Sequence, residues 1–160
     1  GVGEALRNAA HVFRLYLITN QSGIGRGFYS MEQAVACNDR LIELLKLPSP
    51  GFHGICIAPE TPDDPQVYRK PSPKYILEMI KRDGLDPNRC YMIGDRTSDL
   101  ESGINAGIES ILVGSGNGEK REKALEYARV RNLRVFPGLP DAVKELLNEA
   151  GAIAGQKSLT

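Results

Sequence analysis

Short apolar runs alternate with longer segments of helical spacing along most of this chain. The apolar runs predict strands at residues 14–18, 53–58, 90–93, 110–113 and 133–136, and the helical spacing predicts helices at residues 1–10, 31–47, 75–80, 97–106, 119–131 and 140–150. Strands and helices in this order form right-handed βαβ units, which build a parallel sheet with helices on both faces. We therefore predict an α/β, doubly wound fold.

The size and charge of the chain favour one soluble domain. Of the 160 residues 41% are apolar, which predicts a single domain at residues 1–151 and a flexible tail at residues 152–160. Twenty basic and 20 acidic residues balance, and this does not favour a nucleic-acid surface. No apolar run reaches the roughly 18 residues of a membrane span, and no signal-peptide pattern is present. With three widely spaced cysteines, typical of reduced thiols, these features predict a cytoplasmic protein.

The predicted strand at residues 90–93 is followed by two aspartates. Gly94 ends the apolar run, Asp95 comes next, and Asp99 follows four residues later. The carboxyl end of a strand in an open parallel sheet lies where such folds bind ligands, and paired carboxylates attract a hard cation such as Mg2+. A second interpretation stays open, in which Asp95 caps the next helix and Asp99 only interacts favourably with its dipole.

Three further polar residues are predicted at the same edge of the sheet. Thr19 and Asn20 follow the first predicted strand, and Lys70 precedes a helix. A hydroxyl and backbone N–H groups after a strand hydrogen-bond phosphate oxygens, and a lysine at a helix start neutralises their charge. Each residue alone has a simpler explanation, since Thr and Asn form turns and lysine is common on surfaces. Their shared position with Asp95 and Asp99 predicts a site for a phosphoryl group.

Three segments of the sequence resemble motifs of a known enzyme family. Residues 19–27 (T-N-Q-S-G-I-G-R-G), 69–73 (R-K-P-S-P) and 94–99 (G-D-R-T-S-D) are similar to motifs II, III and IV of haloacid-dehalogenase-like phosphatases. In this form they resemble the subfamily of histidinol-phosphate phosphatases and D-glycero-D-manno-heptose 1,7-bisphosphate phosphatases, over about residues 1–147. The resemblance implies a Rossmann-like core without a large cap domain. It also implies Mg2+-dependent hydrolysis of a phosphomonoester, either a sugar bisphosphate or histidinol phosphate, through an aspartyl-phosphate.

The resemblance further implies a role for each polar residue at this edge. Lys70 and Asp95 would be catalytic; Thr19, Asn20 and Lys70 would bind phosphate; Ser22, Arg26 and Arg69 would bind the rest of the substrate; Asp95 and Asp99 would hold Mg2+. Guanidinium groups suit phosphate and sugar oxygens. For Arg26, an ordinary surface charge is an equally simple explanation.

One family motif has no counterpart in this sequence. The resemblance implies a strand that ends in D-x-D-x-T and supplies both catalytic aspartates, but no aspartate here follows a strand in a D-x-D arrangement. In the resembled fold that strand lies between the strands predicted at residues 14–18 and 90–93. Each buried backbone group left without a partner there would cost about 1–3 kcal/mol. We therefore expect that a preceding segment of roughly one strand, a loop and a helix start is missing, and that the 160 residues alone are inactive.

The loop before Arg69 also departs from the subfamily pattern. Many members hold a zinc ion there with cysteine and histidine side chains, whereas residues 58–68 contain neither. Zinc is therefore not expected. The prolines at positions 59, 62 and 65 would stiffen the loop instead.

Two other functions stay open. A polynucleotide 3'-phosphatase would share the N-Q-x-G-I-G-R-G and Y-R-K-P segments, although the neutral charge argues against nucleic acid as a partner. A catalytically inactive phosphate-binding or scaffold domain would keep Thr19, Lys70 and Asp95 without the first motif. The physiological substrate, expected to be a small phosphorylated metabolite, and the oligomeric state are not determined by the sequence.

Overall fold

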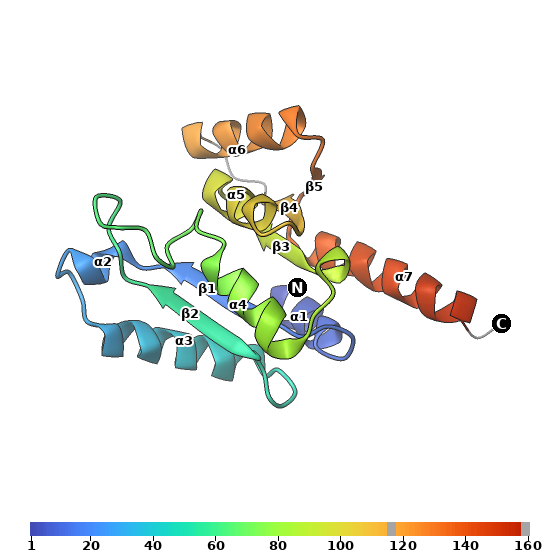
Figure 1. The fold of residues 1–160 in the computed structure, drawn as a ribbon. Coiled ribbons are helices and arrows are strands. Elements are labelled where there is room, and N and C mark those ends of the chain that lie inside the picture. Colours follow the sequence, from blue (N-terminus) through green and yellow to red (C-terminus); the bar gives the residue numbers. More distant parts are fainter. Residues whose placement is uncertain (115–117, 158–160) are drawn as a thin grey trace.

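Strands and helices alternate through the computed structural model, which describes residues 1–114 and 118–157 (Figure 1). The elements are α1 (Val2–Ala9), β1 (Tyr16–Asn20), α2 (Ser22–Gly25), α3 (Met31–Leu45), β2 (Gly54–Ala58), α4 (Lys74–Asp83), η1 (Pro87–Arg89), β3 (Tyr91–Gly94), α5 (Thr97–Asn105), β4 (Glu109–Val113), α6 (Glu119–Val130), β5 (Arg134–Phe136) and α7 (Leu139–Lys157). The predicted alternation is confirmed, and the sequence analysis missed the short α2 and η1. No helix within the described ranges is both long and apolar enough to cross a membrane.

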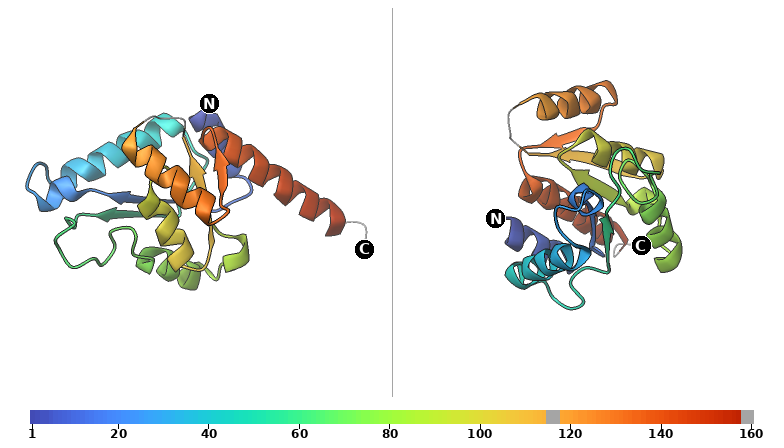
Figure 2. Two further views of the ribbon diagram at one scale, coloured as in Figure 1. Left: turned by 90° about the horizontal axis from the view of Figure 1, so that it is seen from above. Right: turned by 90° about the vertical axis from the view of Figure 1, so that its left-hand side faces the viewer.

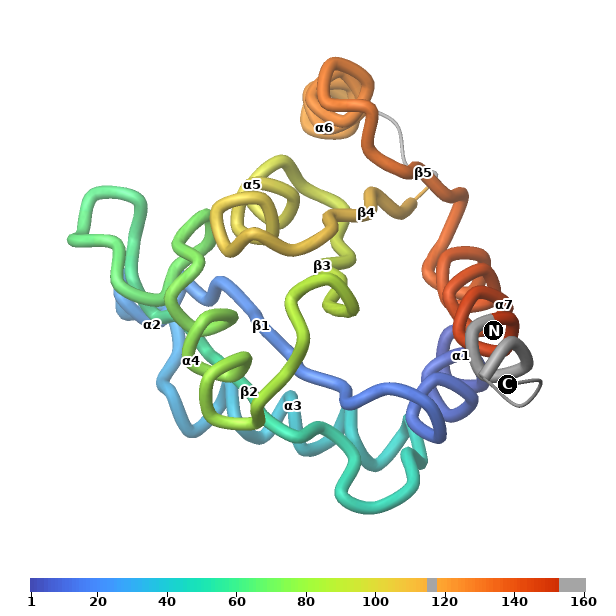
Figure 3. Tube along the Cα trace, turned by 45° about the vertical axis from the view of Figure 1, so that its right-hand side comes forward, coloured from blue at the N-terminus to red at the C-terminus, as the bar shows by residue number. Residues whose placement is uncertain are grey.

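The strands form two parallel groups, which Figure 3 shows as separate parts of the chain trace. β1 pairs with β2, and β3, β4 and β5 pair in that order. The pairs are parallel because a helical connection returns the chain to the same end before each new strand. The predicted α/β class with helices on both faces is confirmed. Among the described residues, however, no ladder joins β1 to β3, so one edge of each of these strands pairs with no described strand.

Both faces of β4 contribute to the core. Neighbouring residues of a strand point to opposite faces, and here Ile111 and Leu112 are both fully buried. Leu112 packs with buried residues of α5 and α6, whereas Ile111 packs with buried residues of α7. Figure 1 accordingly shows α5 and α6 on one side of the strands and α7 on the other. The two clusters are Leu100, Leu112, Ala124 and Ala128, and Ile111, Ala142 and Leu146.

Two of the predicted boundaries that differ from the structure matter here, those of the first strand and of the last helix. β1 begins at Tyr16 and ends at Asn20, because its parallel ladder with β2 covers these residues. Thr19 and Asn20 are therefore the last residues of a strand and not a turn after it. The predicted end of the last helix at Gly151 is wrong: α7 continues to Lys157, since glycine costs only about 1 kcal/mol inside a helix and no proline follows it. Residues 158–160 of the predicted tail lie outside the described residues.

The 59–69 loop and α2 lie side by side beyond the ends of β1 and β2 (Figure 2). The N–H of Gly25 donates to the carbonyl oxygen of Pro59 over 3.2 Å. A Cβ atom on Gly25 would come within 2.7 Å of that oxygen, so glycine permits this close approach of two backbones. The two connections are thereby fixed to each other at the edge where the sequence predicts the site.

Candidate active site

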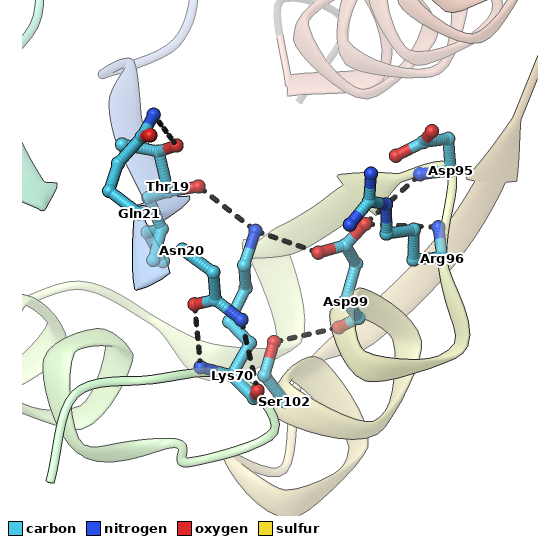
Figure 4. A network of polar contacts seen from close by, with 9 residues as sticks. Thr19, Asn20, Gln21, Lys70, Asp95, Arg96, Asp99 and Ser102 are labelled. Atoms are coloured by element: carbon cyan, nitrogen blue, oxygen red, sulfur yellow. Dashed lines mark hydrogen bonds and ion pairs between the residues drawn. The ribbon is translucent and has the colours of Figure 1, made fainter. Parts of the chain in front are cut away.

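Lys70 lies at the centre of a network of polar contacts (Figure 4). Its Nζ atom is 2.7 Å from Oδ1 of Asp99, on α5, and donates to the carbonyl oxygen of Ile18, on β1, over 2.9 Å. The Lys70 and Asp99 side chains are only 11% and 6% exposed, so this ion pair is mostly removed from water. An ammonium has three donors, and these two contacts leave the third for a ligand. The structure thus brings two predicted site residues together and connects the two groups of strands through them.

The side chain of Asn20 holds the backbone of Lys70. Its Oδ1 atom accepts the Lys70 N–H over 2.9 Å, and its Nδ2 atom donates to the Lys70 carbonyl oxygen over 3.1 Å. The sequence analysis predicted Asn20 as a phosphate ligand. In the structure both the oxygen and the nitrogen of its side-chain amide bond the Lys70 backbone, and these two bonds fix the position from which the Lys70 side chain extends.

Asp99 shapes the turn that follows β3. Its Oδ2 atom accepts the backbone N–H groups of Asp95 and Arg96 over 3.1 and 3.0 Å, while its Oδ1 atom contacts Lys70. A Cβ atom on Gly94 would come within 2.3 Å of the Asp99 Cβ atom, so glycine is needed at the end of β3. Both oxygens of the buried Asp99 carboxylate are therefore occupied by groups that position the rest of the site.

Asp95 is exposed directly after β3. Within the part of the chain that the structure describes, its carboxylate accepts no hydrogen bond. In Figure 4 a dashed line reaches the backbone nitrogen of Asp95, and none reaches its carboxylate. A free carboxylate at this edge fits one ligand of a hard cation such as Mg2+. No three histidine, cysteine or acidic side chains among the described residues come together as a complete metal site.

A short chain of side-chain hydrogen bonds orients the hydroxyl of Thr19. The Tyr29 hydroxyl donates to Gln21 Oε1 over 2.5 Å, and Gln21 Nε2 donates to Thr19 Oγ1 over 3.0 Å. Because Thr19 accepts from Gln21, its own proton is free to be donated to a ligand. A Cβ atom on Gly23 would lie 2.2 Å from the Tyr29 ring, so glycine makes room for the tyrosine. Sequence reasoning missed the roles of Gln21 and Tyr29.

The predicted substrate-binding residues lie around this network and not within it. Ser22 begins α2, and Arg26 is exposed at the end of the same helix. The Arg69 guanidinium donates to the carbonyl oxygen of Glu60 over 3.1 Å. A further exposed guanidinium, that of Arg96, directly follows Asp95. The sequence analysis did not single it out, although a basic residue next to a predicted metal ligand was a usable signal.

Cys56 of β2 is the nearest thiol in the sequence to the 59–69 loop, and it is only 7% exposed. Burial, followed by the carboxylate of Glu60, raises the pKa of Cys56 to about 11. Since the thiolate is the nucleophilic form, the raised pKa and the burial of Cys56 do not favour it as a nucleophile.

Comparisons with known proteins match this chain to phosphatases. A family model described as HAD-hydrolase-like matches residues 67–142. The chain is 34% identical over 158 residues to the D-glycero-D-manno-heptose-1,7-bisphosphate 7-phosphatase of Chlorobaculum tepidum, covering 90% of this chain and 74% of that protein. It is 36% identical over 116 residues to a D-glycero-beta-D-manno-heptose-1,7-bisphosphate 7-phosphatase of Helicobacter pylori, covering 71% of this chain. The chain spans 66% of the length of that relative.

Solved structures give the same fold. The D,D-heptose 1,7-bisphosphate phosphatase from B. bronchiseptica, complexed with magnesium and phosphate, superposes with a TM-score of 0.80 at 27% identity and covers 92% of this chain and 82% of that one. A HAD-like phosphatase from Mesorhizobium loti superposes with a TM-score of 0.58 at 28% identity and covers 89% of this chain and 70% of that one. Both matches extend over nearly all of the elements described above.

Proposed function

This chain belongs to the haloacid-dehalogenase-like phosphatases, in the branch of the heptose 1,7-bisphosphate 7-phosphatases, and on that premise we propose that it is part of a Mg2+-dependent phosphatase acting on heptose 1,7-bisphosphate. The names of the relatives support the substrate. The magnesium and phosphate in the B. bronchiseptica complex support the metal and the phosphate product. A cytoplasmic location belongs to the same proposal.

The observation that carries the proposal is the Lys70 network. A buried ammonium held by Asp99 and Ile18 lies at the same edge as the Thr19 hydroxyl and the exposed carboxylate of Asp95. Positive charge, a hydrogen-bond donor and a potential metal ligand are the groups that a transferring phosphoryl group requires.

Each of these residues would have a distinct task. Lys70 would neutralise the phosphoryl charge, and Thr19 would donate its free proton to a phosphoryl oxygen. Asp95 would be a ligand of Mg2+, which when bound supplies positive charge to the phosphoryl oxygens. Direct metal ligation by Asp99 remains a prediction, but its engaged oxygens favour an indirect role in which it orients Lys70 and the Asp95 backbone.

The nucleophile must come from a strand that these residues do not provide. We propose that a strand ending in D-x-D-x-T pairs with the open edges of β1 and β3 and places its two aspartates beside Lys70. The unpaired edges among the described residues support this position. In this arrangement the first aspartate would attack phosphorus and form an aspartyl-phosphate. The second would protonate the leaving oxygen and then activate water.

Ser22, Arg26 and Arg69 would hold the part of the sugar that does not react. Their positions on α2 and the 59–69 loop, which lie side by side, support this role. The polar edge of the site suits a phosphorylated sugar, and we assign the same role to Arg96. Because these residues lie outside the Lys70 network, they would affect substrate choice more than the rate of phosphoryl transfer.

Phosphate release from three substrates, measured with this chain together with a strand that supplies the D-x-D-x-T aspartates, tests the proposal. Heptose 1,7-bisphosphate should be hydrolysed in the presence of Mg2+ but not after chelation, and histidinol phosphate and a 3'-phosphorylated oligonucleotide should be much poorer substrates. Adding zinc in place of Mg2+ should not restore the activity. Equal or faster release from the oligonucleotide would contradict the proposed substrate. Binding of inorganic phosphate without release from any substrate would favour the alternative of an inactive phosphate-binding domain.

A further inference from the structure

The 59–69 loop is organised around one carboxylate. Oε1 of Glu60 accepts the backbone N–H of Tyr68 over 2.7 Å, that of Val67 over 3.2 Å and that of Arg69 over 3.4 Å. These three N–H groups come from the end of the loop, whereas Glu60 stands at its beginning. A single side chain therefore closes the loop at its base and satisfies consecutive backbone donors that would otherwise need water.

The charge of Glu60 strengthens this closure. Burial acts to raise the pKa of the Glu60 carboxyl, but the backbone N–H groups of Tyr68, of Glu60 itself and of the other two loop residues outweigh it and hold the pKa below its usual value. Hydrogen bonds to an ionised acceptor are roughly twice as strong as those to a neutral one. The second oxygen, Oε2, is buried and has no partner among the described residues, so the bonds of the loop are concentrated on one oxygen atom.

The closed loop leads directly into the site. The Glu60 carbonyl oxygen accepts the Arg69 guanidinium over 3.1 Å, so the same residue contacts both the backbone and the side chain of Arg69. The next residue is Lys70, whose N–H and carbonyl oxygen are held by Asn20. The segment from Tyr68 to Lys70 is thus held by Glu60 on one side and by the end of β1 on the other.

From these contacts we propose that Glu60 is a positioning residue for the active site. It holds the base of the 59–69 loop closed, so that Arg69 is fixed beside Glu60 and Lys70 is placed where its ammonium reaches Asp99 and Ile18. Glu60 does not contact the reacting atoms. The inference rests on the proposed function only for the tasks of Arg69 and Lys70, and the hydrogen bonds themselves are independent of it.

The same loop provides a matched control. Oδ2 of the exposed Asp64 accepts the N–H of Thr61 over 2.7 Å at the tip of the loop. No contact among the described residues connects Asp64 to Arg69 or Lys70. Asp64→Asn removes one negative charge from the loop, as Glu60→Gln does, but leaves the base of the loop intact.

Amide hydrogen exchange of the full chain, followed by NMR residue by residue, tests the proposal. Glu60→Ala should accelerate exchange at Tyr68 and Val67 by about tenfold or more, because charge-assisted bonds to both amides are lost. Glu60→Gln should give an intermediate acceleration, because a neutral oxygen still accepts. The Lys70 amide, which donates to Asn20 and not to Glu60, should also exchange faster in both variants. Asp64→Asn should leave all three amides at wild-type rates. Circular dichroism should show that each variant remains folded.

The outcomes distinguish a positioning residue from a local loop contact. If the Lys70 amide keeps its wild-type exchange rate in Glu60→Ala, or if Asp64→Asn accelerates it equally, the proposal is overturned. In the enzyme completed by a strand that supplies the D-x-D-x-T aspartates, Glu60→Ala should lower kcat/KM for heptose 1,7-bisphosphate about tenfold, with a loss in kcat because Lys70 is displaced, and an unchanged kcat/KM would overturn the proposal as well. If the wild-type chain completed by that strand does not hydrolyse this substrate, the proposed function fails, and the exchange rates alone decide the role of Glu60.

Discussion

At the scale of single residues, Lys70 is held by three parts of the chain, through Ile18, Asn20 and Asp99. The motifs predicted that Lys70, Asp95 and Asp99 belong to one site, and the structure brings Lys70 and Asp99 into contact. They did not predict that Asn20 would bind the Lys70 backbone, 50 residues away. The role of Glu60 was missed for the same reason. Such hydrogen bonds depend on the path of loops, and loops have no periodic pattern that a sequence reveals.

Removing one partner of the Lys70–Asp99 ion pair should strongly destabilise the fold, because both side chains are mostly buried and the remaining charge would be left unpaired. Asp99→Asn leaves the ammonium without its counter-charge and should lower the free energy of unfolding by about 3–5 kcal/mol. The exposed pair Arg40–Glu43 provides the control. Glu43→Gln should change the free energy of unfolding by less than about 1 kcal/mol. Denaturant unfolding measures both. Equal losses of unfolding free energy in the two variants would contradict the larger effect expected for the buried pair.

The Glu60 carboxyl should make the loop sensitive to acid. Its pKa is lower in the folded loop than the ordinary value of 4.5, so the loop is stabilised fully above pH 4.5 and loses this stabilisation as pH falls through the lower folded-state pKa. The Tyr68 amide proton signal, followed by NMR from neutral to acidic pH, should titrate with this carboxyl. The step should vanish in Glu60→Gln. An identical titration in that variant would assign the step to another group.

At the scale of elements, periodicity predicted most helices and strands, because buried faces repeat along them. It failed where local geometry decides: α2 is only four residues long, and α7 continues through a glycine. Periodicity also did not predict how closely α5 packs on β3 and β4. A Cβ atom on Gly103 would lie 2.2 Å from Ser110 Oγ and 2.7 Å from Met92 Cβ, so this helix approaches the strands more closely than any side chain would allow.

Two glycine-to-alanine substitutions in helices should therefore have opposite effects. Alanine usually stabilises a helix by about 0.5–1 kcal/mol relative to glycine. Gly151→Ala in α7 should show this gain, because no atom lies within 4 Å of its added Cβ. Gly103→Ala should instead destabilise the protein by about 1–3 kcal/mol through overpacking. Thermal unfolding of both variants measures the difference, and a Gly103→Ala variant as stable as wild type would contradict the close packing described here.

At the scale of the whole molecule, the parallel α/β arrangement followed from the order of strands and helices, whereas the division into two groups of strands followed only from the missing family motif. A peptide that forms a strand ending in D-x-D-x-T should fill the edges of β1 and β3 by strand addition. Because it would bind the folded state, it should raise the Tm of the chain and produce phosphatase activity.

A second peptide with both aspartates changed to asparagine is the control for this experiment. It should raise the Tm to a similar extent without producing phosphate release, because the strand would pair but the nucleophile would be absent. No change in Tm at high concentrations of either peptide would contradict the proposed place of the strand.

The position of Lys70 between the two groups of strands has a consequence for folding cooperativity. β1 and β2 are consecutive strands and pair with each other, and β3, β4 and β5 are consecutive and pair in the same way. Each group can therefore behave as a separate unit in partial unfolding. Lys70 contacts Ile18 in the first unit and Asp99 in the second. A phosphate ligand that binds this ammonium would hold both units at once. Because α1 packs against α7 as well, the ligand would add to an existing link between the units and favour unfolding of the molecule as a whole.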